Sequence, residues 1–439
     1  MMRILDWRGV SVEDGAFKAD LPRVGASEFD VGGAAAELID QVRLGGSAAL
    51  LEQAARFDGV APRSVRLDPV TAKASVNALA PELRDAIDIA IDRVRRASAL
   101  QVPESRSVEL APGALITQRF VPVDRAGVYV PGGKAVYPSS VVMNVVAAQV
   151  AGVSSIALAS PPQADWDAQI HPTILATATL LGIDELYQMG GAGAVGALAY
   201  GVDDIGLEPV SVITGPGNRY VAAAKRLVKG VVGIDSEAGP TEIVVIADSG
   251  APAESVAADL VSQAEHDELA QAVLITTDVE LARAVSEHVE RRARATAHSE
   301  RAVAALSGAQ SAIIVVDTLD QAVRVSDALA PEHLEIMTVN AGDVAEGIRH
   351  AGAIFVGPDT PVSAGDYLAG SNHVLPTGGR ATFQSGLSAL TFLRPQQIVA
   401  YTHDALRDIS APLGVFARAE NLPAHAEAVE ARFVEGQGQ

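Results

Sequence analysis

Residues 139–160 read SSVVMNVVAAQVAGVSSIALAS and belong to a segment without charged residues that spans 135–164. Length alone would allow a membrane-spanning helix. Polar residues and Gly152 interrupt the apolar run, however, and favour a buried helix over roughly 139–151 followed by a short strand over 154–160. A buried helix followed by a buried strand is the repeating unit of a parallel α/β sheet.

The same alternation extends along most of the chain. Helix-length, alanine-rich stretches separate most of the apolar runs GVYV, SSIALAS, DELYQM, VSVIT, EIVVIAD, AVLITT, AIIVVD, HLEIMTV and AIFVG. Short apolar strands separated by helices are typical of parallel sheets covered on both faces. The runs are too numerous for one small sheet, so we expect two α/β units.

Composition narrows the possible functions. The chain has 439 residues, with 33 Lys plus Arg against 54 Asp plus Glu and a formal net charge of −21. So acidic a surface repels nucleic-acid backbones and anionic lipids, and we expect neither nucleic acid nor membrane as a partner. Cysteine is absent, which excludes disulfides, thiolate metal sites and a cysteine nucleophile. Acidic residues interrupt the N-terminal stretch where a signal peptide would be apolar, so we expect a cytoplasmic enzyme.

Three glycine-rich turns follow predicted strands and open predicted helices: GVYVPGGK, QMGGAGAVGALA and VITGPGNRY. Unpaired amides at a helix N-terminus suit phosphates. Gly191, Gly193 and Gly196 match G-x-G-x-x-G, but the acidic residue expected about 20 residues further on is missing. The pattern therefore indicates tight turns more than a dinucleotide fingerprint, and the GPGN turn is the better nucleotide candidate.

Gln263 occupies a position where a helix would normally carry an apolar residue. In the predicted helix AESVAADLVSQAEHDE, Val256 and Leu260 define a buried stripe; Gln263 continues it, and His266 lies at its edge. A buried amide without a partner costs about 1–3 kcal/mol, so Gln263 needs one. Two interpretations stay open: a satisfied hydrogen bond in the core, or an amide oxygen and an imidazole nitrogen that bind one metal ion.

Glu332 and His333 begin the strand HLEIMTV. Residues at strand ends in open α/β sheets face the binding crevice, where a carboxylate and an imidazole can act as base and acid. In a straight strand the two side chains point to opposite faces, so their convergence requires a bent backbone. A structural role for the pair is also open.

Further candidate ligands follow in the last quarter of the chain. The loop PVSAGDYLAGSNHVLPTGG places Asp366 and His373 seven residues apart. In a helix they would be about 10.5 Å apart along the axis, so we expect only one to bind a given ion. Glu420 and His425 lie near the C-terminus, where His425 taken alone is typical of a surface position. Gln263, His266, Asp366 and His425 together would offer two nitrogen and two oxygen donors. Such a set suits zinc and also admits manganese or cobalt.

The segments AGPTEIVVIAD, SQAEHD, APEHLEI, SAGDYLAGSNHVLPTGG and PAHAEA occur in this order in one known family. Over nearly its whole length the sequence resembles the histidinol dehydrogenases. The resemblance implies oxidation of L-histidinol to L-histidine in two successive NAD-dependent steps, through a tightly held aldehyde, at the end of histidine biosynthesis. It also implies one zinc ion per subunit and a homodimer that exchanges C-terminal domains and shares its active sites.

The resemblance assigns roles to residues of this chain by motif. Glu332 and His333 resemble the catalytic pair, His373 resembles a substrate-orienting residue, and Tyr129 and Asn218 match nucleotide contacts. The implied zinc ligands are Gln263, His266, Asp366 and His425. The implied substrate-binding residues are these ligands together with Thr241, His333, His373 and Glu420. In two departures, Thr241 stands where many relatives have Ser, and Gly193 stands where many have Gln, so that this nucleotide contact is lost or supplied elsewhere.

The fold that the resemblance implies is α/β, with two Rossmann-like parallel-sheet domains that lack the usual dinucleotide fingerprint and small helical extensions at both ends. We expect an N-terminal extension over 1–25 and a first α/β domain, with most zinc and catalytic residues, over 26–125 plus 241–385. A second α/β domain with NAD contacts would span 126–240. A domain exchanged with the partner subunit would span 386–439 and bring Glu420 and His425 to the neighbouring site.

The residue chemistry constrains such a reaction. His333, neutral near its ordinary pKa of about 6.5, would take the hydroxyl proton of the substrate in the first oxidation. Because the chain has no cysteine, the second oxidation needs water, which Glu332 would activate. Zinc would fix the imidazole and the amine of the substrate. Two rival interpretations are a zinc hydrolase that uses Glu332 to activate water without NAD, and a non-catalytic metal- or small-molecule-binding protein.

Overall fold

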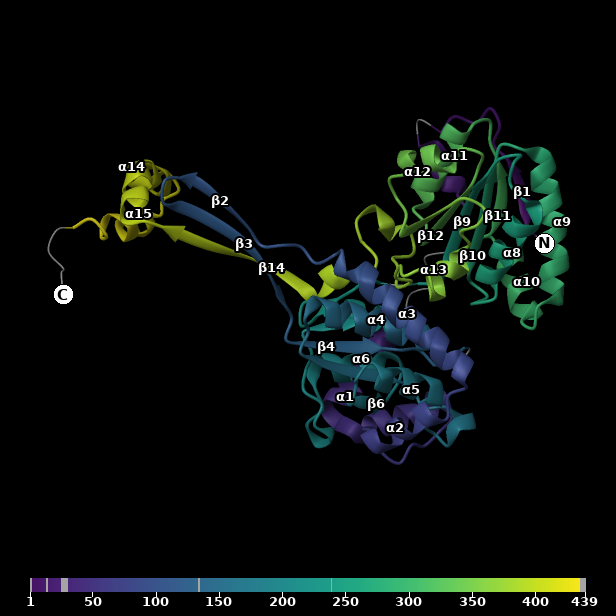
Figure 1. Ribbon diagram of the computed structural model, residues 1–439, viewed down its shortest axis with the longest axis horizontal. Helices are drawn as coiled ribbons and strands as arrows, with labels where there is room; N and C mark the ends of the chain where they lie inside the picture. The colour runs from purple at the N-terminus through teal and green to yellow at the C-terminus, as the bar shows by residue number, and fades with distance from the viewer. Residues whose placement is uncertain (1, 13–14, 25–30, 133–134, 238, 435–439) are drawn as a thin grey trace. The chain divides into compact units, whose positions relative to one another are not determined.

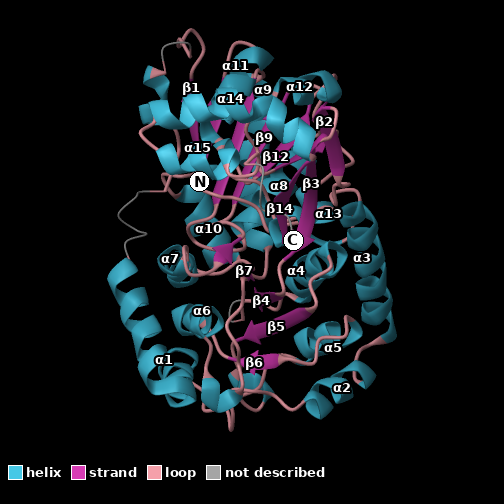
Figure 2. Ribbon diagram, turned by 90° about the vertical axis from the view of Figure 1, so that its left-hand side faces the viewer, coloured by secondary structure: helices cyan, strands magenta, loops and turns pink. Residues whose placement is uncertain are grey.

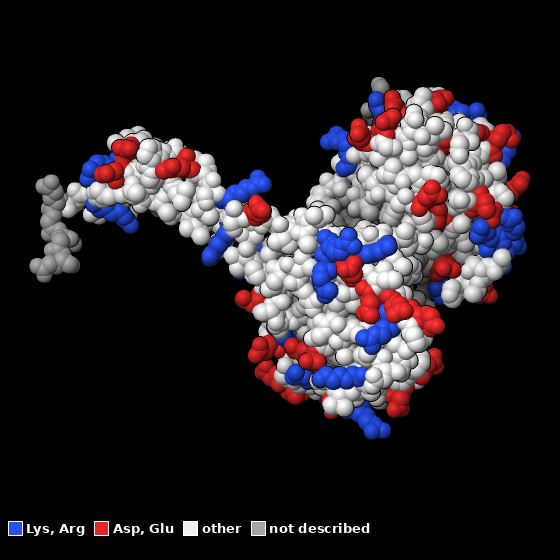
Figure 3. All heavy atoms as spheres, viewed as in Figure 1, with Lys and Arg blue, Asp and Glu red and all other residues white. Residues whose placement is uncertain are grey.

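The computed structural model (Figure 1) describes residues 2–12, 15–24, 31–132, 135–237 and 239–434. The chain forms two units. The first unit comprises Met1–Gln101 and Val123–Phe392, and the second unit comprises Val102–Pro122 and Leu393–Gln439. Within the described ranges, no helix is both long and apolar enough to cross a bilayer. Acidic and basic side chains are interspersed on the face seen in Figure 3.

One sheet of the first unit has five parallel strands in the order β6-β5-β4-β7-β8. Four of them, β4 to β7, are labelled in Figure 2. Its strands are β4 (Arg125–Tyr129), β5 (Ser155–Ser160), β6 (Leu186–Gln188), β7 (Val212–Thr214) and β8 (Gly233–Ile234). The connecting helices are α4 (Pro138–Ala151), α5 (Pro172–Leu180), α6 (Gly191–Tyr200) and α7 (Arg219–Val228). Numbered along the chain, the strands have the spatial order 3-2-1-4-5 of doubly wound sheets, and the winding direction reverses between β4 and β7.

Helices from the N-terminal quarter cover the helices of this sheet. α1 (Gly32–Gln53) contacts α6 and α7, α2 (Pro69–Asn77) contacts α5, and α3 (Pro81–Ala99) contacts α4. A π-helical turn, Ala54–Asp58, continues α1. The apolar side chains of α1 share one core with the alanine- and glycine-rich α6, whose small residues allow the two helices to approach closely.

The other sheet of the first unit has six parallel strands in the order β1-β11-β10-β9-β12-β13. Its strands are β1 (Arg3–Asp6), β9 (Glu242–Ala247), β10 (Gln271–Thr276), β11 (Ala312–Val315), β12 (His333–Met337) and β13 (Ala353–Val356). The associated helices are α8 (Ala253–Ala264), α9 (Val279–Ala295), α10 (Ser299–Ser307), α11 (Leu319–Leu329), α12 (Ala341–Gly347) and α13 (Val362–Tyr367). Two apolar cores, one on each face, bury alternate residues of the central strands.

The second unit is built on three antiparallel strands in the order β14-β3-β2. They are β2 (Arg106–Ala111), β3 (Ala114–Pro122) and β14 (Leu393–Tyr401), and they are followed by α14 (His403–Ala419) and α15 (Pro423–Glu430), which pack together. Most residues of β2 and β14 are exposed. Short 3₁₀ turns elsewhere in the chain are Ala16–Asp20, Ala164–Trp166, Asp203–Ile205, Arg380–Thr382 and Ala389–Phe392.

The predicted helix–strand unit at 139–160 is confirmed. α4 is buried along its length and ends at Gly152, whose φ of 92° lies in the left-handed region that favours glycine, and β5 follows. The expected pair of parallel α/β sheets is present.

The expected domain boundaries differ from the observed grouping. The described residues 31–125 do not join the six-stranded sheet, because α1–α3 contact the helices of the five-stranded sheet and β3 pairs with β14 along nine residues. The N-terminal extension contributes a strand, β1, to the six-stranded sheet and is not purely helical. The C-terminal segment likewise contains the long strand β14. Residues 13–14 and 25–30, where the first boundary was expected, lie outside the described residues.

Candidate active site

A cavity of about 630 Å³, here called the cleft, is lined by residues of both parallel sheets of the first unit. Among the predicted site residues, those that line it are Tyr129, Asn218, Thr241, Gln263, His266, Glu332, His333, Asp366 and His373. Residues as far apart in the sequence as Tyr129 and His373 thus meet in one cleft, and most of them lie near the end of a strand or helix. The two predicted residues outside it, Glu420 and His425, belong to the second unit.

Glu332 lies directly before β12 and is almost fully buried. Its Oε2 accepts hydrogen bonds from the Thr241 hydroxyl at 2.6 Å and from the Glu242 backbone N–H at 2.9 Å. Burial nevertheless raises the pKa of Glu332 to about 8, and the two hydrogen bonds oppose that rise. A carboxyl group with such a pKa can exchange a proton near neutral pH, as a general base must.

His333, the first residue of β12, is held by its Nδ1. Nδ1 donates a hydrogen bond to the Glu242 carbonyl oxygen at 3.0 Å, which leaves Nε2 as the basic nitrogen of the neutral ring. Nε2 is buried and has no hydrogen-bond partner among the described residues; Asp366 Oδ1 is 3.9 Å away. Burial lowers the pKa of His333, which favours the neutral base.

The two side chains converge, as the acid–base interpretation requires. Nδ1 of His333 lies 3.5 Å from Oε2 of Glu332. Glu332 precedes the strand, and Ala330 two residues earlier has a φ of 49°, in the left-handed region. This bend before β12 removes the alternation that would separate the side chains in a straight strand.

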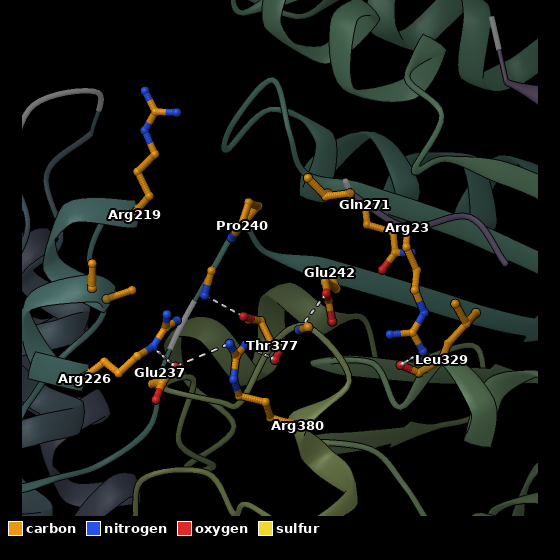
Figure 4. Close-up of a pocket in the computed structure, with 15 residues that line it drawn as sticks. Arg23, Arg219, Arg226, Glu237, Pro240, Glu242, Gln271, Leu329, Thr377 and Arg380 are labelled. Carbon is orange, nitrogen blue, oxygen red and sulfur yellow. Dashed lines mark hydrogen bonds and ion pairs between the residues drawn. The ribbon is translucent and has the colours of Figure 1, made fainter. Parts of the chain in front are cut away.

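Glu242, which sequence reasoning missed, connects the catalytic pair to a second cavity. Its backbone N–H and C=O hold Glu332 and His333, whereas its side-chain Oε1 accepts the N–H of Gly378 at 2.8 Å. Burial raises the pKa of Glu242 to about 7. Its side chain lines a cavity of about 350 Å³ (Figure 4), which is also lined by the four arginines Arg23, Arg219, Arg226 and Arg380. The position of Glu242 at the start of an apolar strand, next to Thr241, was the available signal.

Gln263 and His266 lie at the end of α8, as the helical stripe predicted. Gln263 is 2% exposed, and its Nε2 donates to the Thr241 hydroxyl, which leaves the amide oxygen as a possible metal donor. Burial lowers the pKa of His266, while the nearby Asp366 opposes that shift. In the part of the chain that the structure describes, no three His, Cys, Asp or Glu residues form a metal-binding group. A metal here would therefore need the Gln263 amide as well as His266 and Asp366.

His373 contacts Asp366 through the backbone and not as a second ligand. Its Nδ1 donates to the Asp366 carbonyl oxygen at 3.0 Å, and its Nε2 lies 3.1 Å from the hydroxyl of Ser140. α13 ends at Tyr367, and the chain turns at Gly370, whose φ is 97°. The helical spacing considered for the two residues therefore does not apply. Burial lowers the pKa of His373, so its ring is neutral at this wall of the cleft.

Tyr129 and Asn218 are on the five-stranded sheet, on either side of the reversal between β4 and β7. Tyr129 ends β4, and its buried hydroxyl accepts the N–H of Gly191 at 3.2 Å; burial raises its pKa to about 12. Asn218 caps α7, with its Oδ1 accepting the N–H of Tyr220 at 2.9 Å. Both residues are therefore fixed in place before any ligand binds.

A buried ion pair holds the GPGN turn that precedes α7. The Lys225 ammonium contacts the Asp235 carboxylate, and both side chains are at most 2% exposed. Lys225 donates to the Gly215 carbonyl oxygen at 2.9 Å, and Asp235 Oδ2 accepts the Gly215 N–H at 2.8 Å. Gly215 has a φ of 119°, and a Cβ there would overlap the Tyr129 carbonyl oxygen. The pair was not predicted from the sequence.

Gly193, one of the two departures from the family pattern, faces α1. A Cβ at Gly193 would overlap Oε1 of Gln53, and a Cβ at Gly196 would lie 3.1 Å from Ile39. Gln53 is buried, and its Nε2 donates to the Leu38 carbonyl oxygen at 3.0 Å. These two glycines of the G-x-G-x-x-G match therefore make room for α1, and the carboxamide of Gln53 fills the space beside position 193.

Glu420 and His425 lie in the second unit. Glu420 directly follows α14, His425 is in the first turn of α15, and both are exposed. Their predicted roles in binding substrate and metal stay predictions.

Comparisons with known proteins agree over the full chain. The model of the histidinol dehydrogenase family matches residues 22–433. The histidinol dehydrogenase of Leifsonia xyli subsp. xyli is 57% identical over 434 residues, covering 99% of this chain and 100% of that protein. The histidinol dehydrogenase of Corynebacterium glutamicum is 51% identical over 433 residues, covering 99% of this chain and 98% of that protein.

A solved structure has the same fold. The crystal structure of histidinol dehydrogenase from Elizabethkingia anophelis superposes with a TM-score of 0.91 and 33% identity, covering 98% of each chain. The family model and these relatives cover both parallel sheets and most of the second unit. The chain therefore belongs to the histidinol dehydrogenase family.

Proposed function

We propose that this protein oxidises L-histidinol to L-histidine in two NAD-dependent steps, as a histidinol dehydrogenase of histidine biosynthesis. The observation that carries the proposal is the Glu332–His333 pair, two buried bases 3.5 Å apart in one cleft. Oxidation of an alcohol and then of an aldehyde hydrate requires a base at each step, and the pair offers two. The names of the full-length relatives indicate the substrate.

His333 is the base of the first oxidation in this proposal. Its Nδ1 is occupied by the Glu242 carbonyl oxygen, so the proton of the substrate hydroxyl goes to Nε2. The Asp366 carboxylate, 3.9 Å from Nε2, then stabilises the imidazolium. The anchor at Nδ1 also fixes the ring plane, so Nε2 keeps one direction while the proton moves.

Glu332 activates the water needed for the second oxidation. The chain has no cysteine that could form a covalent adduct with the aldehyde, so an oxygen nucleophile must come from water. The carboxylate that accepts this proton is held by Thr241 and by the Glu242 backbone. A threonine at position 241 keeps the hydroxyl donor on which this arrangement depends.

Gln263, His266 and Asp366 are the residues of the first unit that would hold zinc. The three line one cleft and offer an amide oxygen, an imidazole and a carboxylate, which suit the ion, but zinc usually takes four ligands. We infer that the partner subunit's His425 supplies the fourth. When bound, zinc supplies a fixed anchor for the imidazole and amine of the substrate.

The nucleotide site lies, in this proposal, at the reversal between β4 and β7. When bound there, NAD accepts the hydride of each oxidation. Tyr129, Gly132, Gly217 and Asn218 line the cleft at this point. In doubly wound sheets, dinucleotides bind at the point where the strand order reverses. The glycine turns and the capped N-terminus of α7 at this point suit such a ligand. Gly193 is turned toward α1 and is not one of the contacts proposed.

Exposed apolar side chains on the second unit support a homodimer with exchanged C-terminal domains. They include Val108, Leu110, Leu115, Val399, Val415 and Phe416. Soluble monomers rarely expose so many apolar side chains on a small three-stranded unit. We infer that a second copy of the chain covers them and receives Glu420 and His425 into its cleft. We keep the cytoplasm as the expected location.

A mixing experiment tests the shared site. His425→Ala in one chain and His333→Asn in the other leave one intact site in a mixed dimer. We expect mixed subunits to recover part of the wild-type activity that neither variant has alone. Absence of recovery after verified subunit exchange would contradict sharing.

The stoichiometry of NADH formation from L-histidinol tests the function itself. Purified protein with added zinc should form two NADH per histidinol, and a chelator should abolish both turnover and histidinol binding. One NADH per histidinol would mean that the aldehyde escapes and that the role given to Glu332 is wrong. No NADH, with hydrolysis of an ester or amide, would favour the zinc hydrolase.

A further inference from the structure

Asp58 is a carboxylate without an assigned role. It ends the π-helical turn Ala54–Asp58, just before Gly59, whose φ of 70° lets the chain leave the helix. Among the described residues, no hydrogen bond or ion pair to its carboxylate is found, although the surrounding protein raises its pKa to about 6. The side chain is exposed, so its carboxylate is open to the hydrogen-bond donors of a ligand.

The carboxylate lies at the end of the five-stranded sheet that borders the cleft. A Cβ at Gly190, which follows β6, would lie 3.5 Å from Asp58 Oδ2 and 2.8 Å from Cβ of Pro161, which follows β5. Pro161 in turn is 2.8 Å from a Cβ built on Gly132, which lines the cleft. Asp58, Pro161 and Gly132 therefore lie in one row along the carboxyl ends of these strands.

Tyr129 provides a second connection between Asp58 and the cleft. Its hydroxyl accepts the N–H of Gly191, the residue after Gly190. The charge of Asp58 contributes to the raised pKa of Tyr129, so the two side chains are within electrostatic range of each other. A molecule that extends from the cleft along Tyr129 toward β6 would meet the Asp58 carboxylate.

The strand order defines what such a carboxylate does in other doubly wound sheets. β4, β5 and β6 are the first, second and third strands of the 3-2-1-4-5 order. In dinucleotide-binding sheets, an acidic residue about 20 residues beyond the glycine-rich turn accepts hydrogen bonds from the ribose of the adenosine half of NAD. Here β5 is followed by Pro161 and Pro162, neither of which can do so. Asp58, from the π-helical turn that continues α1, places a carboxylate beside that position.

We propose that Asp58 accepts hydrogen bonds from the 2′- and 3′-hydroxyls of the adenosine ribose of NAD and makes the protein select NAD over NADP. The inference rests on the proposed function, because it assigns one end of the same nucleotide. The selection follows from charge: the 2′-phosphate of NADP would replace a hydroxyl donor with an anion next to a carboxylate.

Nucleotide binding by Asp58→Asn and Asp58→Ala tests the inference. We expect the Kd for NADH, measured by fluorescence titration without substrate, to rise about tenfold or more. The KM for NAD should rise by a similar factor, whereas the KM for histidinol stays the same. The ratio of kcat/KM for NADP to that for NAD should increase at least about tenfold, because repulsion of the 2′-phosphate is removed.

Glu52→Ala is the matched control, since Glu52 is exposed on the same helix and carries the same charge. An unchanged Kd for NADH in both Asp58 variants, or an equal rise in the Glu52 variant, would overturn the inference. Thermal unfolding of each variant shows that a loss of binding is not a loss of folding. A wild-type protein that binds NADH but forms none from histidinol would contradict the proposed function and leave the assignment of Asp58 to be decided by these titrations.

Discussion

The two parallel sheets of the first unit face the cleft with opposite ends of their strands. On the five-stranded sheet, Tyr129 is the last residue of β4 and Gly215 directly follows β7, so the carboxyl ends of the strands face the cleft. On the six-stranded sheet, Glu242 and His333 are the first residues of β9 and β12, so the amino ends face it. The rule that ligands bind at the carboxyl edge of an open α/β sheet holds here for one sheet of the two.

The difference separates two kinds of chemistry. The carboxyl ends of parallel strands lead into glycine turns and helix N-termini, whose backbone N–H groups bind phosphates and nucleotides. At the amino edge, the backbone N–H and C=O of Glu242 point at side chains and fix Glu332 and His333. The proposed catalytic bases therefore lie on the six-stranded sheet, and the rigid glycine turns on the five-stranded one.

His333→Asn should have the largest effect, and it affects only the residues at the amino ends of the strands. The amide can still donate to the Glu242 carbonyl oxygen but cannot accept the hydroxyl proton, so kcat should fall by about 10²–10⁴. The Kd for NADH, which depends on the other edge, should stay within about twofold of the wild-type value. Steady-state kinetics and fluorescence titration measure the two quantities. A variant that keeps near wild-type kcat would show that another group takes the proton.

Glu332→Gln tests whether Glu332 and His333 serve different oxidation steps. The amide keeps the size of the side chain but cannot activate water, so oxidation of the aldehyde should slow by about 10²-fold, more than oxidation of the alcohol. Because burial raises the pKa of Glu332 to about 8, the carboxylate fraction grows as pH rises through that value. The wild-type rate of aldehyde oxidation should therefore increase with pH across this range, and the variant should lose the increase. Equal slowing of both half-reactions would refute the division.

Lys225→Met or Asp235→Leu tests the carboxyl ends of the five-stranded sheet. Either change leaves a buried charge without its partner and should lower the free energy of unfolding by about 3–5 kcal/mol. The Gly215 backbone loses one of its two anchors, so the Kd for NADH should also rise, by about tenfold. The double variant Lys225→Met/Asp235→Leu should recover much of the stability and none of the nucleotide affinity. Recovery of both would mean that the ion pair does not position the GPGN turn.

Gly193→Ala has the smallest expected effect and tests the packing behind the nucleotide edge. The new methyl group overlaps Oε1 of Gln53 and should lower the free energy of unfolding by about 1–3 kcal/mol, measured by denaturant titration. Adding Gln53→Ala in the same chain should return most of that loss. If the single variant is as stable as the wild type, the carboxamide is not confined beside position 193.

The sequence predicted the helices and strands better than it predicted which strands pair. The helix–strand unit at 139–160 follows from apolar length and from Gly152, which are local signals. Period-two patterns do not name a partner strand, so nothing local indicates that 114–122 pairs with 393–401 or that β1 joins β11. Local patterns also do not indicate that α1, α2 and α3 contact the helices of the five-stranded sheet.

Some residues of the candidate site could be predicted from the sequence and others could not. Gln263 was visible because a polar residue interrupts an apolar stripe, and the remaining roles came from motifs of the family. Glu242 was missed because it acts on Glu332 and His333 through backbone atoms that every residue has, and its position before an apolar strand does not reveal that role. The Lys225–Asp235 pair was also hidden, since opposite charges ten residues apart are common and only burial around Gly215 makes this one important.

The backbone anchor at Glu242 has a consequence for how the family can diverge. Any residue except proline retains the N–H and C=O that hold the catalytic pair. Substitutions at position 242 can therefore alter the arginine-lined cavity while the two main-chain hydrogen bonds to the catalytic pair persist. Evolution can tune that neighbouring cavity in one lineage after another at little risk to catalysis, and a protein engineer has the same freedom.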